Sequence, residues 1–130
     1  MNDQPPVNHP LYSSLAEIAI DMRSSWNHAA DDVWRALDPE LWQLTREPWS
    51  VLQSVSWDRI ELVGKSTAFV KNVDSLVQAR RQAVESPAWF QQHHAQAALT
   101  SIAYFCMEFM LSEALPIYSG GLGNVAGDQL

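Results

Sequence analysis

Cysteine is nearly absent from this sequence, because Cys106 is the only one in 130 residues. No disulfide can therefore form within the chain, and a lone thiol fits a reducing compartment. Long apolar runs are also missing: none approaches the roughly 18 residues that a membrane-spanning helix needs. The opening stretch, MNDQPPVNHP, has neither the basic nor the apolar segment of a signal peptide. We therefore expect a cytoplasmic protein with no membrane partner.

Basic residues are few, with 8 lysines and arginines against 15 acidic residues and a net charge of -7. A nucleic-acid backbone is bound by clustered basic side chains, so nucleic acid is excluded as a partner. The pair Arg80 and Arg81 is more typical of a solvated helix face. His93 and His94 are adjacent, whereas metal ligands on one helix face are about three or four residues apart, so no metal site is predicted.

Apolar residues make up 47% of the chain, which is ordinary for one globular domain. From Leu15 onward they recur at the three- and four-residue steps of helices. Helix starts are predicted at Asp38-Pro39-Glu40, where an acid precedes a proline, and at Ser56-Trp57. Gly64 is predicted to end one helix, and a longer helix is predicted from about Thr67.

The tryptophans at positions 26, 34, 42, 49 and 57 follow one another at intervals of 8, 8, 7 and 8 residues. Aromatic faces can stack on sugar rings, so one interpretation is a sugar-binding surface. The other is a set of core anchors, one on each short helix. We favour the core, because most of these residues stand beside leucine, isoleucine or valine at helical spacing.

The pattern changes at residues 102–107, which form a continuous apolar run without helical periodicity. Such a short run is typical of a buried strand in a parallel sheet. Cys106 lies inside it and is expected to act as a small apolar residue rather than a nucleophile. Glu108 follows at the carboxyl end, where ligands bind in open α/β sheets. It is either a ligand-binding acid or simply the charge that ends the strand.

Glycine is scarce, yet three of the five glycines lie at positions 120, 121 and 123, before a predicted helix. Glycines let the backbone approach a ligand, and amides at a helix start favour an anion. The pattern GGLG matches neither the dinucleotide nor the P-loop fingerprint. By composition alone it could equally be any tight strand-to-helix turn.

These patterns divide the chain into a flexible lead-in (residues 1–12), a helical region (13–98) and the start of an α/β lobe (99–130). A single strand is not stable alone, and a helix of about seven residues is marginal in water. We therefore expect that the polypeptide continues beyond Leu130.

Two stretches, AYFCMEF at residues 103–109 and LPIYSGGLG at residues 115–123, together resemble the α-glucan phosphorylases. This family contains the glycogen, starch and maltodextrin phosphorylases. The helical part resembles its bacterial and archaeal branch in weaker motifs: SWN at 25–27, LDPELW at 37–42 and PAWF at 87–90. The resemblance extends from about Leu15 to Leu130, and only the last thirty or so residues carry specific motifs.

The resemblance implies a two-lobed glycosyltransferase B-type fold with Rossmann-like lobes. It implies cleavage of an α-1,4-glucan by inorganic phosphate to give glucose 1-phosphate, with pyridoxal phosphate as cofactor. It implies a phosphate- and glucosyl-binding loop at Gly120, Gly121, Leu122 and Gly123, and an acid near the cleft at Glu108. No catalytic residue and no cofactor lysine falls within these 130 residues, so we expect the isolated chain to be inactive.

Two alternatives remain. Glycogen and starch synthases, which are nucleotide-sugar transferases, also have a strand, an acid and a GGLG turn. They usually carry a lysine two residues before the first glycine, where this chain has Tyr118, and they lack a long helical region in front. The other alternative is a non-catalytic helical module that binds a glucan or a protein.

Overall fold

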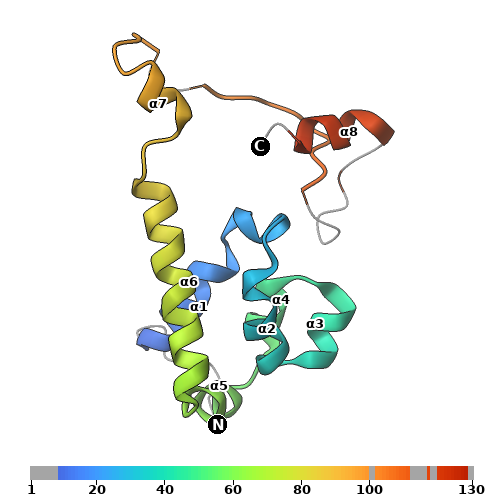
Figure 1. The fold of residues 1–130 in the computed structure, drawn as a ribbon. Coiled ribbons are helices and arrows are strands. Elements are labelled where there is room, and N and C mark those ends of the chain that lie inside the picture. The colour runs from blue at the N-terminus through green and yellow to red at the C-terminus, as the bar shows by residue number, and fades with distance from the viewer. Residues whose placement is uncertain (1–8, 100–101, 112–116, 118–119, 129–130) are drawn as a thin grey trace. The chain divides into compact units, whose positions relative to one another are not determined.

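The computed structural model describes residues 9–99, 102–111, 117 and 120–128. The chain divides into two compact units, Met1–Ala83 and Val84–Leu130. The helices (Figure 1) are α1 Pro10–Ala19, η1 Met22–Ser25, η2 His28–Ala30, α2 Asp31–Leu37, α3 Pro39–Thr45, α4 Pro48–Ser54, α5 Trp57–Gly64, α6 Thr67–Glu85, α7 Trp89–His93 and α8 Gly120–Gly127. The expectation of a mainly helical region is confirmed.

Local capping sets several of these helix starts. The Asp38 carboxylate accepts a hydrogen bond from the Leu41 amide at 2.9 Å, directly before the proline that opens α3. The Ser56 hydroxyl accepts one from the Arg59 amide at 3.3 Å and caps α5, which ends at Gly64 as predicted. Each cap satisfies an amide that has no partner within the first turn of its helix.

The first helix begins earlier than expected. Pro10 opens α1, whereas the lead-in was expected to extend to residue 12. A proline suits the first turn of a helix, because its fixed φ fits there and its missing amide hydrogen would have no partner. Residues 1–8 of the expected lead-in lie outside the described residues.

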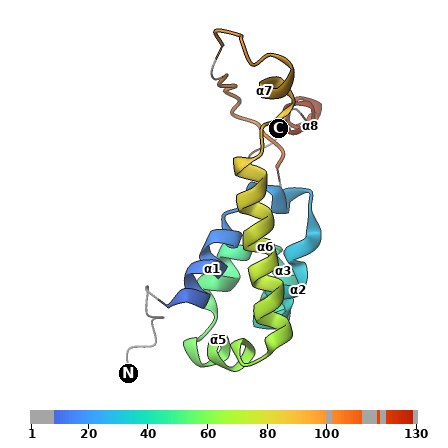
Figure 2. The same cartoon turned by 60° about the vertical axis from the view of Figure 1, so that its left-hand side comes forward.

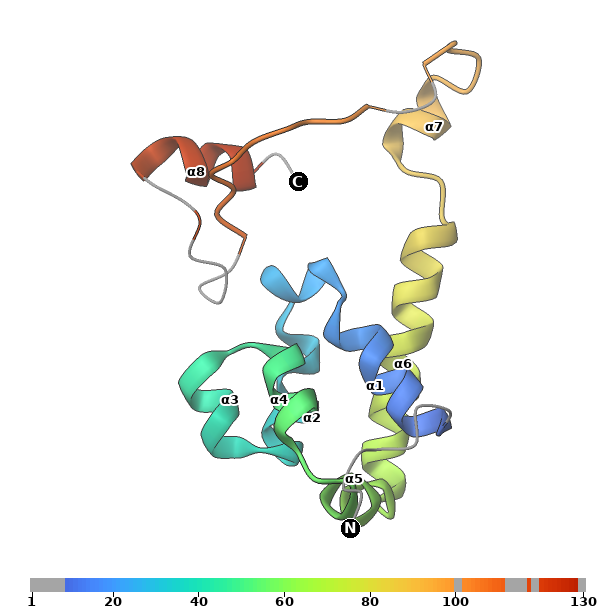
Figure 3. The same ribbon diagram turned by 180° about the vertical axis from the view of Figure 1, so that it is seen from behind.

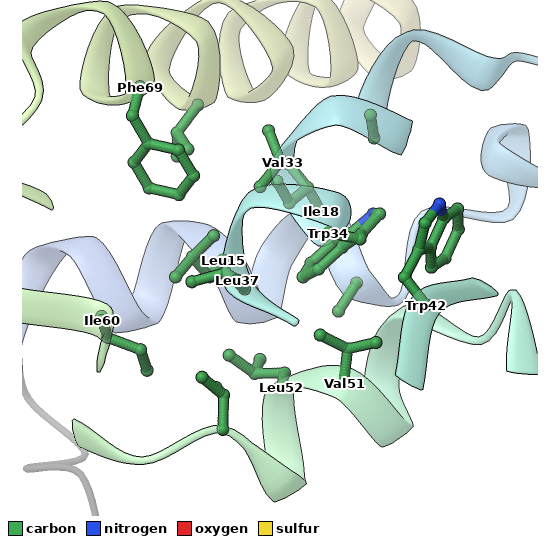
Figure 4. Packing of buried hydrophobic residues seen from close by; sticks show 14 of the residues in the cluster. Leu15, Ile18, Val33, Trp34, Leu37, Trp42, Val51, Leu52, Ile60 and Phe69 are labelled. Atoms are coloured by element: carbon green, nitrogen blue, oxygen red, sulfur yellow. The ribbon is translucent and has the colours of Figure 1, made fainter. Parts of the chain in front are cut away.

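Helix α6 lies beside α1 in three views of the molecule (Figures 1, 2 and 3). Helix α4 contacts α1, α2 and α3, so the short helices surround a shared interior. The side chains of this interior pack together around Trp34 and Leu37 (Figure 4). Its buried members are Leu15, Ile18, Ala19, Ala30, Val33, Trp34, Leu37, Trp42, Val51, Leu52, Val55, Ile60, Phe69, Val73 and Val77.

The tryptophans divide between core and surface. Trp34 and Trp42 are buried, and Trp57 packs partly buried against the core, so the core interpretation is confirmed for these three. Trp26 and Trp49 are exposed by 58% and 37%. Burial therefore does not follow the regular spacing of these residues along the sequence.

In the second unit, the predicted strand at residues 102–107 is not formed: the backbone there makes no ladder within the described part of the chain. Ile102, Phe105 and Met107 are exposed by 78%, 90% and 91%, although we predicted a buried strand. A strand needs a neighbouring strand for its backbone hydrogen bonds, and the described residues supply none. The Rossmann-like lobe stays a prediction.

Candidate functional site

The glycine motif lies in the first turn of α8, and this corrects the expected loop. We predicted a helix after Gly123, but α8 begins at Gly120. Gly120 has a φ of 64°, in the left-handed region that favours glycine, so the backbone changes direction there. Helical geometry then continues to Gly127.

The exposed part of this turn is its N-terminal end. Gly120, Gly121 and Leu122 are exposed, whereas Gly123 is buried. A Cβ atom added at Gly121 would meet nothing within 4 Å. A helix of eight residues presents its first amides without intrahelical partners, and its dipole favours an anion at that end. The turn can therefore receive hydrogen-bond acceptors at exposed backbone.

The opposite face of α8 packs against the segment that follows Glu108. The Met110 amide donates a hydrogen bond to the Gly123 carbonyl at 3.0 Å. At Gly127 an added Cβ would lie 2.1 Å from the Met110 carbonyl oxygen, so only glycine fits. These contacts place the Met110 backbone against α8, and Figures 1 and 3 show the orange segment running beside this helix.

Glu108 is half-buried, and its backbone amide donates to the Cys106 Sγ at 3.4 Å. Its carboxylate makes no contact with Gly120–Gly123 among the interactions found for the described residues. The structure thus brings the backbone near Glu108 to the glycine helix without joining the two predicted site elements through side chains.

Gly127 was not recognised from the sequence as a site residue. Its signal is the four-residue step from Gly123, which places two glycines on one face of the helix, with the buried Ala126 next to them. Small residues at this spacing indicate a close backbone approach. The partner, Met110, could not be predicted, because it lies 17 positions before Gly127 in the chain.

Histidines and acids do not gather into a metal site: across the described ranges, no group of three or more His, Cys, Asp and Glu side chains could hold an ion. His93 stacks on Trp89, with ring centroids 5.1 Å apart, and its Nδ1 lies 2.9 Å from the Trp89 carbonyl oxygen. No helix of the described chain is long and apolar enough to cross a membrane.

Among the described residues, the side chains with shifted pKa values lie in the first unit. Burial raises the pKa of Asp21, but hydrogen bonds from the Arg23 side chain and amide outweigh it and lower that pKa. The same hydrogen bonding raises the pKa of Arg23. Hydrogen bonding from Arg81, with the charges of Arg80 and Arg81, lowers the pKa of Glu17.

Comparison with known proteins places the chain in a family. The family described as "Protein of unknown function (DUF3417)" matches residues 10–115. The glycogen phosphorylase of Mycobacterium tuberculosis is 36% identical over 124 residues, which are 91% of this chain and 14% of that protein. The maltodextrin phosphorylase of Thermococcus litoralis is 32% identical over 117 residues, which are 89% of this chain and 14% of that protein.

A third relative, the glycogen phosphorylase of Aquifex aeolicus, is 27% identical over 89% of the chain and 16% of its own length. The chain therefore spans only about a seventh of the length of the curated relatives it matches. No solved structure matches the chain at a significant level. The chain belongs to the DUF3417 family, and it is similar over most of its length to the N-terminal part of proteins named glycogen or maltodextrin phosphorylase.

Proposed function

We propose that the chain forms the N-terminal part of an α-1,4-glucan phosphorylase. The observation that carries this proposal is its similarity, over 89–91% of its residues, to proteins named glycogen and maltodextrin phosphorylase. In this reaction an oxygen of inorganic phosphate replaces the glucan O4 on C1 of the terminal glucosyl unit. Overall, the departing O4 gains the proton of the hydrogen phosphate, and the products are glucose 1-phosphate and a shortened glucan. Cytoplasmic location remains a prediction from the single cysteine.

In this enzyme the exposed turn at Gly120, Gly121 and Leu122 would bind phosphate or the glucosyl unit, with Gly123 as its buried base. Support comes from the exposed backbone and from the open space at Gly121. An anion placed there would gain from the unpaired amides and from the dipole of α8. Glu108 would lie near the same cleft, because the residues that follow it pack on α8.

Residues 99–130 would begin the Rossmann-like lobe. The side chains of Ile102, Phe105 and Met107 are almost fully exposed, and burying each would gain on the order of 1.5–3 kcal/mol. A neighbouring strand from another part of the whole protein would bury them and would supply backbone hydrogen bonds. The predicted strand would then form through that non-local pairing.

Pyridoxal phosphate, the cofactor that the family implies, does not fit the residues of this chain. Its aldehyde is held by a lysine, and the only lysines here are Lys65 and Lys71, both exposed and both in the helical unit. The cofactor lysine of the proposed enzyme must come from residues outside 1–130.

The names of the relatives favour a phosphorylase over a nucleotide-sugar synthase. The position that would carry the synthase lysine, Tyr118, lies outside the described residues. A helical module that only binds a glucan or a protein remains the other alternative, and Trp26 and Trp49 are two exposed aromatic side chains of the helical unit that could contact a glucan.

The test is an assay of the full-length gene product that carries this sequence. With maltodextrin and inorganic phosphate we expect glucose 1-phosphate, and with ADP-glucose and the same glucan we expect no chain extension. Extension from ADP-glucose without phosphorolysis would instead establish the synthase. The 130-residue chain alone should release no glucose 1-phosphate. Retention on glycogen beads without turnover by either form would support the binding module.

A further inference from the structure

Helix α6 has two halves with different surroundings. Its buried residues, Phe69, Val73 and Val77, all lie in its N-terminal part, residues 67–77, and face the core. From residue 78 to the end of the helix at Glu85, no side chain is buried, and Val84 is 75% exposed. The apolar core therefore stabilises only the N-terminal half of this helix.

Polar contacts join the C-terminal half of α6 to α1 and η1. The Arg23 guanidinium donates a hydrogen bond to the Ala79 carbonyl at 3.0 Å. Arg80 and Arg81 both reach the Glu17 carboxylate on α1, at 3.2 Å and 3.0 Å. Glu17 thus receives two cations from consecutive positions of one helix.

The arginine that binds Ala79 is itself held in place. The Asp21 carboxylate accepts from both Nε and Nη2 of Arg23, the shorter bond being 2.6 Å. The Asp21 carboxylate also accepts from the Arg23 amide and so caps η1. Arg23 is therefore held by the residue that caps its own short helix while its guanidinium reaches α6.

We propose that these contacts form a polar latch, made of Glu17, Asp21, Arg23, Arg80 and Arg81, which holds residues 78–85 of α6 in place and releases them when its charges are screened or removed. The latch ends two residues before Ala83, the last residue of the first compact unit. It would control the order of the helical segment that leads into the second unit. This inference goes beyond the proposed function and does not depend on it.

The physical reason is that the two halves of α6 respond differently to salt. Charge pairs near the surface are screened, since the Debye length falls from about 10 Å at 0.1 M to about 3 Å at 1 M. Burial of apolar side chains is not weakened in this way. With no buried side chain to hold it, the C-terminal end of this continuous helix should fray once the latch is released.

Hydrogen exchange on the 130-residue chain tests the latch at 0.05 M and 1 M sodium chloride. We expect the amides of residues 78–85 to exchange about threefold to tenfold faster at high salt, with those of residues 67–77 unchanged. Glu17→Gln should give part of the faster exchange already at low salt and should reduce the salt dependence, because Asp21 and Arg23 still hold Ala79. Glu61→Gln, a change at an exposed glutamate on α5, should behave like the original chain.

A charge swap separates the latch from a general effect of substitution. Glu17→Arg combined with Arg80→Glu and Arg81→Glu should recover at least half of the lost protection, because opposite charges again face each other. Equal exchange of residues 78–85 in the original chain at both salt concentrations and in Glu17→Gln would overturn the proposal. So would a loss of protection in Glu17→Gln that is uniform over both halves of α6, because it would indicate global destabilisation.

Discussion

A pair of leucine substitutions tests whether the short helices share one interior. Leu52 on α4 is 1% exposed, and its helix contacts α1, α2 and α3. Leu44 on α3 is 82% exposed. Both residues lie in helices of seven residues, so Leu52→Ala and Leu44→Ala remove the same side-chain atoms from similar local structure.

The expected magnitude follows from burial. Leu52→Ala removes three carbons from the core. Each removed carbon forfeits about 0.8 kcal/mol of burial free energy, and the cavity left behind adds a further cost. We expect a loss of about 3 kcal/mol in the free energy of unfolding. The total free energy of unfolding of a unit of this size is on the order of 4–12 kcal/mol, so a loss of this magnitude is large. Leu44→Ala should stay within about 0.5 kcal/mol, because its side chain remains in water in both states.

Urea unfolding of the 130-residue chain, followed by tryptophan fluorescence, measures both changes. Trp34 is fully buried, so its emission reports the integrity of the same interior. The slope m should be the same in all three proteins, and the midpoint alone should shift. The reasoning is refuted if Leu52→Ala costs less than about 1 kcal/mol, or if the two substitutions have equal effects.

Three further predictions concern the caps, the charges and the glycines. Asp38→Ala should cost about 1 kcal/mol in urea unfolding through loss of the α3 cap, while Asp38→Asn should recover most of it; equal losses would contradict the capping role. Hydrogen bonding from Arg81, together with the charges of Arg80 and Arg81, lowers the pKa of Glu17, so its contribution to stability is complete above about pH 5 and is lost as the pH falls through the lowered value. Melting temperatures should therefore fall less steeply between about pH 5 and pH 3 in Glu17→Gln than in the original chain, and parallel curves would argue against the pairing. Gly127→Ala should raise the hydrogen-exchange rate of the Met110 amide by about tenfold or more, because the new Cβ displaces that backbone. Gly121→Ala, where the Cβ would meet open space, should leave the rate unchanged, and a similar increase in both variants would refute the packing argument.

Elements set by neighbouring residues were predictable. The start of α3 depends on Asp38 and an amide three residues later, and the start of α5 depends on Ser56 and an amide at the same spacing. The conformation of residues 102–107 was not predictable in the same way. Their apolar pattern indicates that they would be buried in a strand, but it does not indicate whether a neighbouring strand is present. The start of α8 was misplaced, because GGLG is compatible with both a loop and the first turn of a helix.

By itself, the sequence determined the helical character of the first unit, several of its caps and the motifs that resemble α-glucan phosphorylases. These properties depend on residues within one or two turns of each other. Only the tertiary structure decided that Trp34 is buried while Trp26 is exposed, because equal spacing along the chain does not specify which face of each short helix meets the others. Only it brought Glu17 to Arg81, 64 positions away, and Gly127 to the Met110 backbone. Contacts of this kind form when distant segments pack, and no local pattern of residue types encodes them.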